Sequence, residues 1–106
     1  MNDNPMTRRL EHEDFAKHLN STFRIRIDES QTVESQLTEV SELLLSPKQE
    51  RFSLVFRTSN DFFLGQGQRP FEHDVMGKFE LFLVPIGRGE DGTHYEAIFN
   101  RLVKKS

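Results

Sequence analysis

Apolar and polar residues alternate along much of the chain, and a period of two is typical of β-strands with one buried face. The alternation is clean in residues 22–28 and 51–57. Residues 94–99 alternate in the same way, and residues 68–74 form a further short strand, in which Pro70 indicates a sheet edge or an irregular start. The pattern therefore predicts antiparallel strands with one dry and one wet face.

Residues 78–86 differ from these strands because both faces of the extended chain are apolar. The two sets are Phe79, Leu81 and Leu83 on one side, and Phe82, Val84 and Ile86 on the other. A strand of this kind is typical of a sheet centre, or of a barrel whose outside is covered by another element. Pro85 has no N–H group to donate, and we expect it to mark the end of the strand. Residues 87–92 hold three glycines and form a predicted hairpin turn.

A helical period appears only near the N-terminus. Leu10, Phe15 and Leu19 recur at nearly helical spacing, so residues 10–20 are predicted to form a short helix that docks its apolar side on the sheet. Residues 37–45 fit either a helix or a bulged strand, and their neighbours favour the strand.

The remaining polar segments are predicted connections between strands. Residues 29–35 link two strands, residues 46–50 form a hairpin loop, and residues 58–61 and 74–77 form turns. Six strands joined by short connections predict an all-β domain, either a small antiparallel barrel or a barrel-like sandwich. The single short N-terminal helix is expected to close one end of it.

The length of 106 residues leaves room for one domain. We assign residues 10–106 to that domain and residues 1–9 to a polar lead-in. The formal net charge of −3 is spread along the chain, which disfavours a nucleic-acid partner. The chain has no cysteine, no apolar run long enough to span a bilayer and no apolar signal sequence. We therefore expect a cytoplasmic protein that does not bind membranes.

Phenylalanine is the dominant aromatic residue, with ten copies against one tyrosine. Because phenylalanine has no polar group, these rings are expected to fill the core or to form contact surfaces. Phe62, Phe63 and Leu64 form an apolar run between two polar segments. They are predicted either to plug an open end of the barrel or to form an interface with another subunit or partner.

Catalytic and metal-binding signatures are missing from the sequence. The four histidines, His12, His18, His73 and His94, match no metal-ligand spacing, and no G-x-S-x-G motif is present. We expect no metal, no cofactor and no enzymatic activity. Arg101 is expected to pair with a carboxylate that locks the last strand, or to serve a partner site.

Three segments resemble a family of small uncharacterised bacterial proteins. They are EDFAKHLNSTF (13–23), FSLVFR (52–57) and GKFELFLVPIGRGEDGTHYEAIFNR (77–101). Members of that family share a DFA helix start, an FSLLF strand, an ELFLVP strand and a YEAVFNR ending. The family is associated with genes for phage-tail-collar-like proteins, so the resemblance implies a role in a phage-derived or tail-like assembly. It transfers no activity and no site residue.

Three hypotheses about function follow from these observations. The favoured one is a non-enzymatic structural or protein-interaction module that self-associates or docks on a larger assembly. The second is a barrel that binds a small ligand in an apolar interior. The third is an enzyme, which requires at least two of the four histidines to converge beside a carboxylate.

Overall fold

The computed structural model describes residues 10–102, and the predicted lead-in (1–9) and the basic end (103–106) lie outside the described residues. The elements are the helix α1 (His12–Ala16) and the strands β1 (Thr22–Arg26), β2 (Thr32–Val40), β3 (Leu44–Leu45), β4 (Gln49–Thr58), β5 (Gly67–His73), β6 (Gly77–Gly89) and β7 (Gly92–Leu102).

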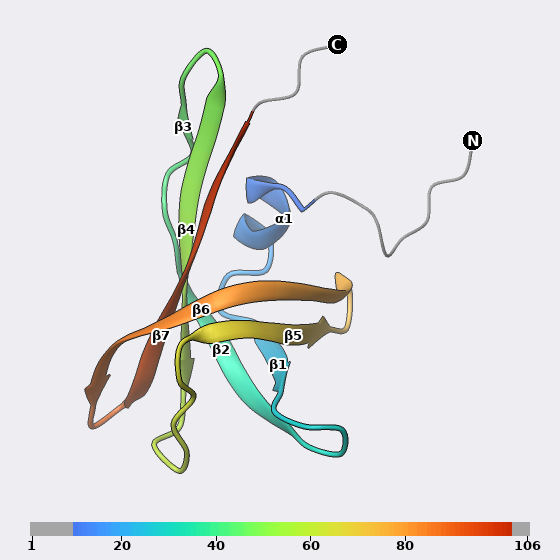
Figure 1. Cartoon of the computed structure of the whole chain (residues 1–106), viewed down its shortest axis with the longest axis vertical. Coiled ribbons are helices and arrows are strands. Elements are labelled where there is room, and N and C mark those ends of the chain that lie inside the picture. The colour runs from blue at the N-terminus through green and yellow to red at the C-terminus, as the bar shows by residue number, and fades with distance from the viewer. Residues whose placement is uncertain (1–9, 103–106) are drawn as a thin grey trace.

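Six of the strands close into an antiparallel barrel, which confirms the predicted all-β fold (Figure 1). The strand order is β2-β1-β5-β6-β7-β4, and β4 pairs back to β2. The strand β3 adds to the outer edge of β4, where Leu44 faces Arg51 and Leu45 faces Glu50. The hairpin of β3 and β4 extends well beyond the barrel along the longest axis of the molecule, as Figure 1 shows.

Aromatic side chains fill the barrel. They occupy inward positions of the strands, which alternate with outward positions along each strand. The rings of Phe56 and Phe71 have centroids 4.9 Å apart, and Phe23 lies 5.3 Å from Phe56. All three side chains are fully buried. The phenylalanines that the alternation placed on inner faces thus form the core, as expected.

The helix α1 closes one end of the barrel with Phe15, its one buried side chain. Phe15 is fully buried and lies within 6.4 Å of the rings of Phe23, Phe52, Phe79 and Phe99. The helix is five residues long, so the predicted span of 10–20 is wrong at both ends. Beyond Ala16 the hydrogen bonds span three residues, from the N–H of His18 to Phe15 O and from the N–H of Leu19 to Ala16 O. The chain then turns toward β2 at Asn20, whose φ of 70° is left-handed and whose N–H donates to Leu37 O.

Two connections are shorter than predicted. The segment 29–35 was expected to be a connection, yet β2 begins at Thr32. The Asp28 carboxylate accepts hydrogen bonds from the N–H groups of Ser30 and Gln31 at 2.8 and 2.9 Å, which closes a tight turn. The loop predicted over 46–50 likewise ends early, because β4 begins at Gln49.

The end of β6 also differs from prediction. Pro85 does not end the strand, which continues to Gly89. The register against β7 instead shifts between Pro85 and Gly87, and this bulge accommodates a residue without an N–H group. Gly89 faces Gly92, so the predicted six-residue turn is a tight turn at Glu90 and Asp91.

Candidate interaction surface

The loop of residues 62–64 has one buried residue and one exposed ring. Leu64 is buried, and its N–H group donates to the Tyr95 hydroxyl at 2.9 Å, so this residue plugs the barrel. Phe62 is partly buried against the core. Phe63 is 57% exposed, with its ring centroid 6.4 Å from that of Tyr95. The run therefore does not form one interface, because its last residue is inside the protein.

Polar contacts around Asn60 anchor this loop to the β6–β7 hairpin. The Asn60 side chain donates to Gly89 O at 2.7 Å and accepts from the Thr93 hydroxyl at 2.9 Å. Arg88 donates to the Asn60 main-chain oxygen at 2.8 Å. Phe63 is thus held at the surface by a fixed loop.

A larger apolar surface lies on the outside of β6 and β7. We call Phe82, Val84, Ile86 and Ile98 the outer apolar patch. Phe82, Ile86 and Ile98 are 48%, 51% and 53% exposed, and Val84 is partly buried. Val84 faces Glu96 at one end of the β6–β7 ladder, and Phe82 and Ile98 lie two residues beyond that pair, where the two strands are no longer paired with each other. The cover expected over the outer face of β6 is thus wrong for the described residues.

A second exposed apolar group lies on the projecting hairpin. Leu44 and Leu45 of β3 are 58% and 67% exposed, and Leu43 just before them is 37% exposed. Leu102 at the end of β7 is 71% exposed. Sequence reasoning missed this group because it joined residues 37–45 into one barrel strand.

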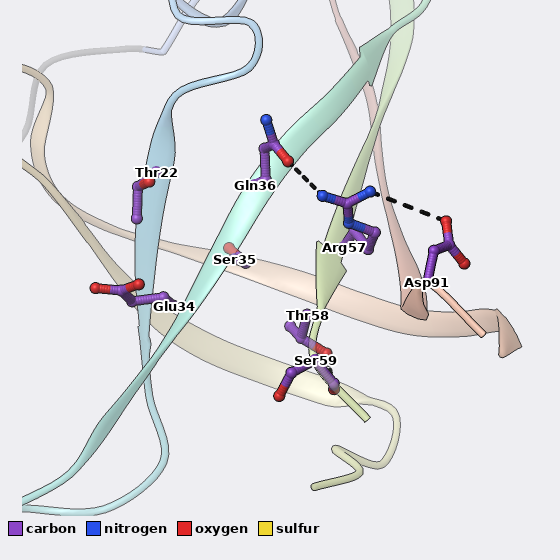
Figure 2. A pocket seen from close by; sticks show the side chains of 8 residues that line it. All are labelled: Thr22, Glu34, Ser35, Gln36, Arg57, Thr58, Ser59 and Asp91. Carbon is purple, nitrogen blue, oxygen red and sulfur yellow. Dashed lines mark hydrogen bonds and ion pairs between the residues drawn. The ribbon is translucent and has the colours of Figure 1, made fainter. Parts of the chain in front are cut away.

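A polar hollow of about 460 Å³ opens on the outer wall near the end of β4 (Figure 2). Its lining residues are Thr22, Glu34, Ser35, Gln36, Arg57, Thr58, Ser59 and Asp91. Arg57 lies between two of them, donating to the Gln36 side-chain oxygen at 2.6 Å and approaching the Asp91 carboxylate at 3.9 Å. The one arginine of the hollow is therefore already engaged by its own neighbours.

Two of the four histidines converge at the junction of the helix region and β5. The ring centroids of His18 and His73 are 4.5 Å apart. Nδ1 of His73 accepts hydrogen bonds from the N–H groups of Val75 and Met76 at 3.0 and 3.1 Å. Nδ1 must therefore be unprotonated, and the proton of the neutral ring lies on Nε2.

This tautomer opposes the proton transfer that a serine nucleophile needs. Nε2 of His73 lies 3.1 Å from the Ser21 hydroxyl, and that hydroxyl donates its own proton to His18 O at 2.6 Å. The imidazole therefore donates to the serine oxygen, whereas a catalytic histidine accepts from it. Burial, followed by the nearby His18, lowers the pKa of His73, so the neutral form is favoured.

The other two histidines lie apart from this pair. Nε2 of His12 is 2.7 Å from Ser41 O, and His94 is 3.3 Å from the Asp91 carboxylate. Within residues 10–102, no group of three or more metal-ligating side chains converges. The described part of the chain also contains no helix long and apolar enough to cross a membrane.

Comparison with known proteins gives one match. Residues 10–99 match the family model described as a domain of unknown function, DUF6916. No curated protein and no solved structure matches the chain significantly.

Proposed function

The chain belongs to the DUF6916 family of domains of unknown function, and we propose that it is a non-enzymatic module that docks on a partner protein. The observation that carries this proposal is the exposure of Phe82, Ile86 and Ile98 on neighbouring strands of the barrel wall. Fully burying an exposed side chain of this kind is worth about 1.5–3 kcal/mol, and these three side chains have about half of their surface left to bury. A group of them on one face is typical of a protein contact surface.

The surroundings of the outer apolar patch fit this role. Phe82 supplies an aromatic anchor of the kind that dominates binding energy. Lys78 and Glu80 precede it on β6 with exposed side chains, and Glu96 lies beside Val84. Apolar residues surrounded by charged ones reproduce the core and rim of a typical interface.

The backbone that carries the patch is held in place by pairing with the flanking strands β5 and β4. In β6, Phe82 faces Gln68 of β5, and in β7, Ile98 faces Ser53 of β4. A partner would therefore meet side chains whose backbone is already ordered, and less conformational entropy would be lost on binding.

We further propose that the partner is a component of a phage-derived or tail-like assembly. The support is the resemblance of segments 13–23, 52–57 and 77–101 to small bacterial proteins associated with phage-tail-collar-like genes.

The two alternative functions receive less support from the geometry. A ligand-binding barrel needs interior space, whereas Phe23, Phe56 and Phe71 fill the inside of this barrel. An enzyme with a histidine site needs an available base, whereas both ring nitrogens of His73 are engaged. The interaction module requires neither.

Site-specific photo-crosslinking in cells that encode the chain tests the proposal. A benzophenone amino acid is placed at Phe82 or Ile98, and for comparison at Glu34, which is exposed on the outer face of β2. We expect one adduct of defined mass from the two patch positions and none from position 34. The same adduct should disappear when Phe82 is photoreactive and Ile98→Ser is introduced.

Identification of the adduct by mass spectrometry separates the two parts of the proposal. A tail or virion protein supports both parts. A different partner protein supports docking and overturns the tail assignment. Identical adducts from all three positions, or none from the patch, overturn the docking role.

A further inference from the structure

A carboxylate lies among the apolar side chains of the outer wall, and it indicates what kind of partner this surface fits. Glu96 faces Val84 of β6 and Val55 of β4, so the three side chains share the outer face of the barrel. Ile98, two residues along β7, points to the same side. We propose that the docking partner places a basic side chain on the outer apolar patch, where it pairs with Glu96. This inference rests on the proposed docking function and adds the chemistry of the partner.

Glu96 differs from the other shielded carboxylates because it has no partner within the chain. Among residues 10–102, the acidic residues that are at least partly buried are Asp14, Glu50, Glu72 and Glu96. The first three accept hydrogen bonds, from the Glu11 N–H, from Arg101 and from Arg26 respectively. No hydrogen bond or ion pair joins the Glu96 carboxylate to any other described residue.

The basic residue two positions from Val55 on the same face of β4 is engaged elsewhere. Arg57 faces His94 in the β4–β7 ladder and donates to the Gln36 side-chain oxygen at 2.6 Å. Glu96 is therefore left as an unpaired charge between two valines, at a position where a β-branched residue would pack better on the sheet. A residue that does not serve the fold in this way is typical of a functional surface.

Docking on the patch would remove water from Glu96 together with its apolar neighbours. Because Val84 and Ile98 lie on either side of Glu96 on this face, a surface that covers both also covers the carboxylate. A carboxylate that loses its water without gaining a partner opposes binding, whereas a positively charged side chain replaces the lost interaction. A purely apolar partner is thereby rejected. Arginine fits better than lysine, because a guanidinium bonds a carboxylate through two N–H groups and stacks on aromatic rings, which Phe82 supplies.

The stability of the isolated chain gives a first test that needs no partner. Glu96→Val places a third valine between Val55 and Val84 and should raise the thermal midpoint by about 2–5 °C. Glu34→Val is the matched control, because Glu34 faces Arg24 in the β1–β2 ladder and its replacement should bring no gain. An unchanged or lower midpoint for Glu96→Val would mean that the carboxylate serves the fold, which overturns the inference.

Photo-crosslinking from position 82 in cells that encode the chain tests the pairing itself. Glu96→Gln keeps the shape of the side chain and removes its charge, so the yield of the adduct should fall about tenfold or more. Glu34→Gln removes a charge from the outer face of β2 and should leave the yield unchanged. If the wild type forms no adduct, the docking function itself fails. If an adduct forms and Glu96→Gln leaves its yield unchanged, docking stands and the basic side chain is overturned.

An exchange of charges identifies the group on the partner. The crosslinked peptide of the adduct locates the partner's basic residues beside position 82, and each is replaced in turn by glutamate. One replacement should abolish the adduct, and Glu96→Lys should restore it in that background while abolishing it with the wild-type partner. The absence of rescue at every such residue overturns the pair and leaves docking in place.

Discussion

Arg101 donates a hydrogen bond from Nε to the Glu50 carboxylate at 2.6 Å, and the two residues face each other in the β4–β7 ladder. The same guanidinium donates to Leu10 O, and its central carbon lies 5.2 Å from the centroid of the Phe99 ring. One side chain thus joins β4, β7 and the segment before α1. The expectation that Arg101 pairs with a carboxylate is confirmed.

Arg101→Met is expected to destabilise the fold by about 2 kcal/mol. The variant keeps most of the aliphatic length but removes the cation from the buried Glu50 carboxylate and the donor from Leu10 O. Urea unfolding measures the change. The control is Arg51→Met, one residue from Glu50 on the exposed face of β4, which should change stability by less than about 0.5 kcal/mol. Equal effects of the two variants would contradict the anchoring role of Arg101.

The neutral state of His73 predicts a loss of stability in mild acid. Burial lowers its pKa below the ordinary value of 6.5, with His18 and Arg24 acting in the same direction and Asp74 opposing them. The unfolded chain therefore binds a proton more readily than the folded protein below about pH 6.5. The contribution of neutral His73 to the free energy of unfolding is fully present above that pH, and it is lost as the pH falls through the pKa of His73 in the folded protein.

Chemical unfolding at several pH values, with a histidine NMR titration, checks this prediction. In His73→Asn the amide oxygen can still accept from the N–H groups of Val75 and Met76, but it does not titrate in this range. Its stability should fall less between neutral pH and mild acid than that of the wild type. A folded-state pKa of His73 above 6.5 would refute the argument.

Gly92→Ala is expected to destabilise the barrel by roughly 3 kcal/mol or more. Gly92 has φ of 134°, and a Cβ atom there would lie 2.1 Å from Thr58 O in β4. Gly87→Ala is the control, because a Cβ atom at Gly87 meets nothing within 4 Å. Thermal unfolding compares the two, and a Gly92→Ala variant as stable as Gly87→Ala would show that the close approach is not required.

Serine substitutions should distinguish the structural roles of Leu64 and Phe63 in the apolar loop. Leu64→Ser places a hydroxyl in the core and leaves a void, which should cost about 3 kcal/mol. Phe63→Ser removes an exposed ring and should cost less than about 1 kcal/mol. Urea unfolding of the two variants gives the comparison. A larger loss for Phe63→Ser would mean that this ring, and not Leu64, plugs the barrel.

The strands themselves could be read from the sequence because their signal is local. Side chains alternate between the two faces of any extended segment, so Phe52, Leu54 and Phe56 share a face whatever lies beyond it. The all-β class and the docking of a short helix followed from such patterns. The missing N–H group of Pro85 predicted the end of the strand, whereas pairing with β7 carries the strand past Pro85 through a bulge.

The candidate surfaces depended on contacts between residues far apart in the chain. The alternation in residues 78–86 gave two apolar faces, and only closure of the barrel through the β2–β4 pairing buries Leu81 and Leu83 while leaving Phe82 exposed. His18 and His73 also meet through a non-local pairing. His18 precedes β1, His73 ends β5, and β1 lies beside β5 in the sheet. Sequence periodicity determines which residues share a face. Which face becomes the interior, and which edge stays open, is decided by the non-local strand pairings that close the barrel.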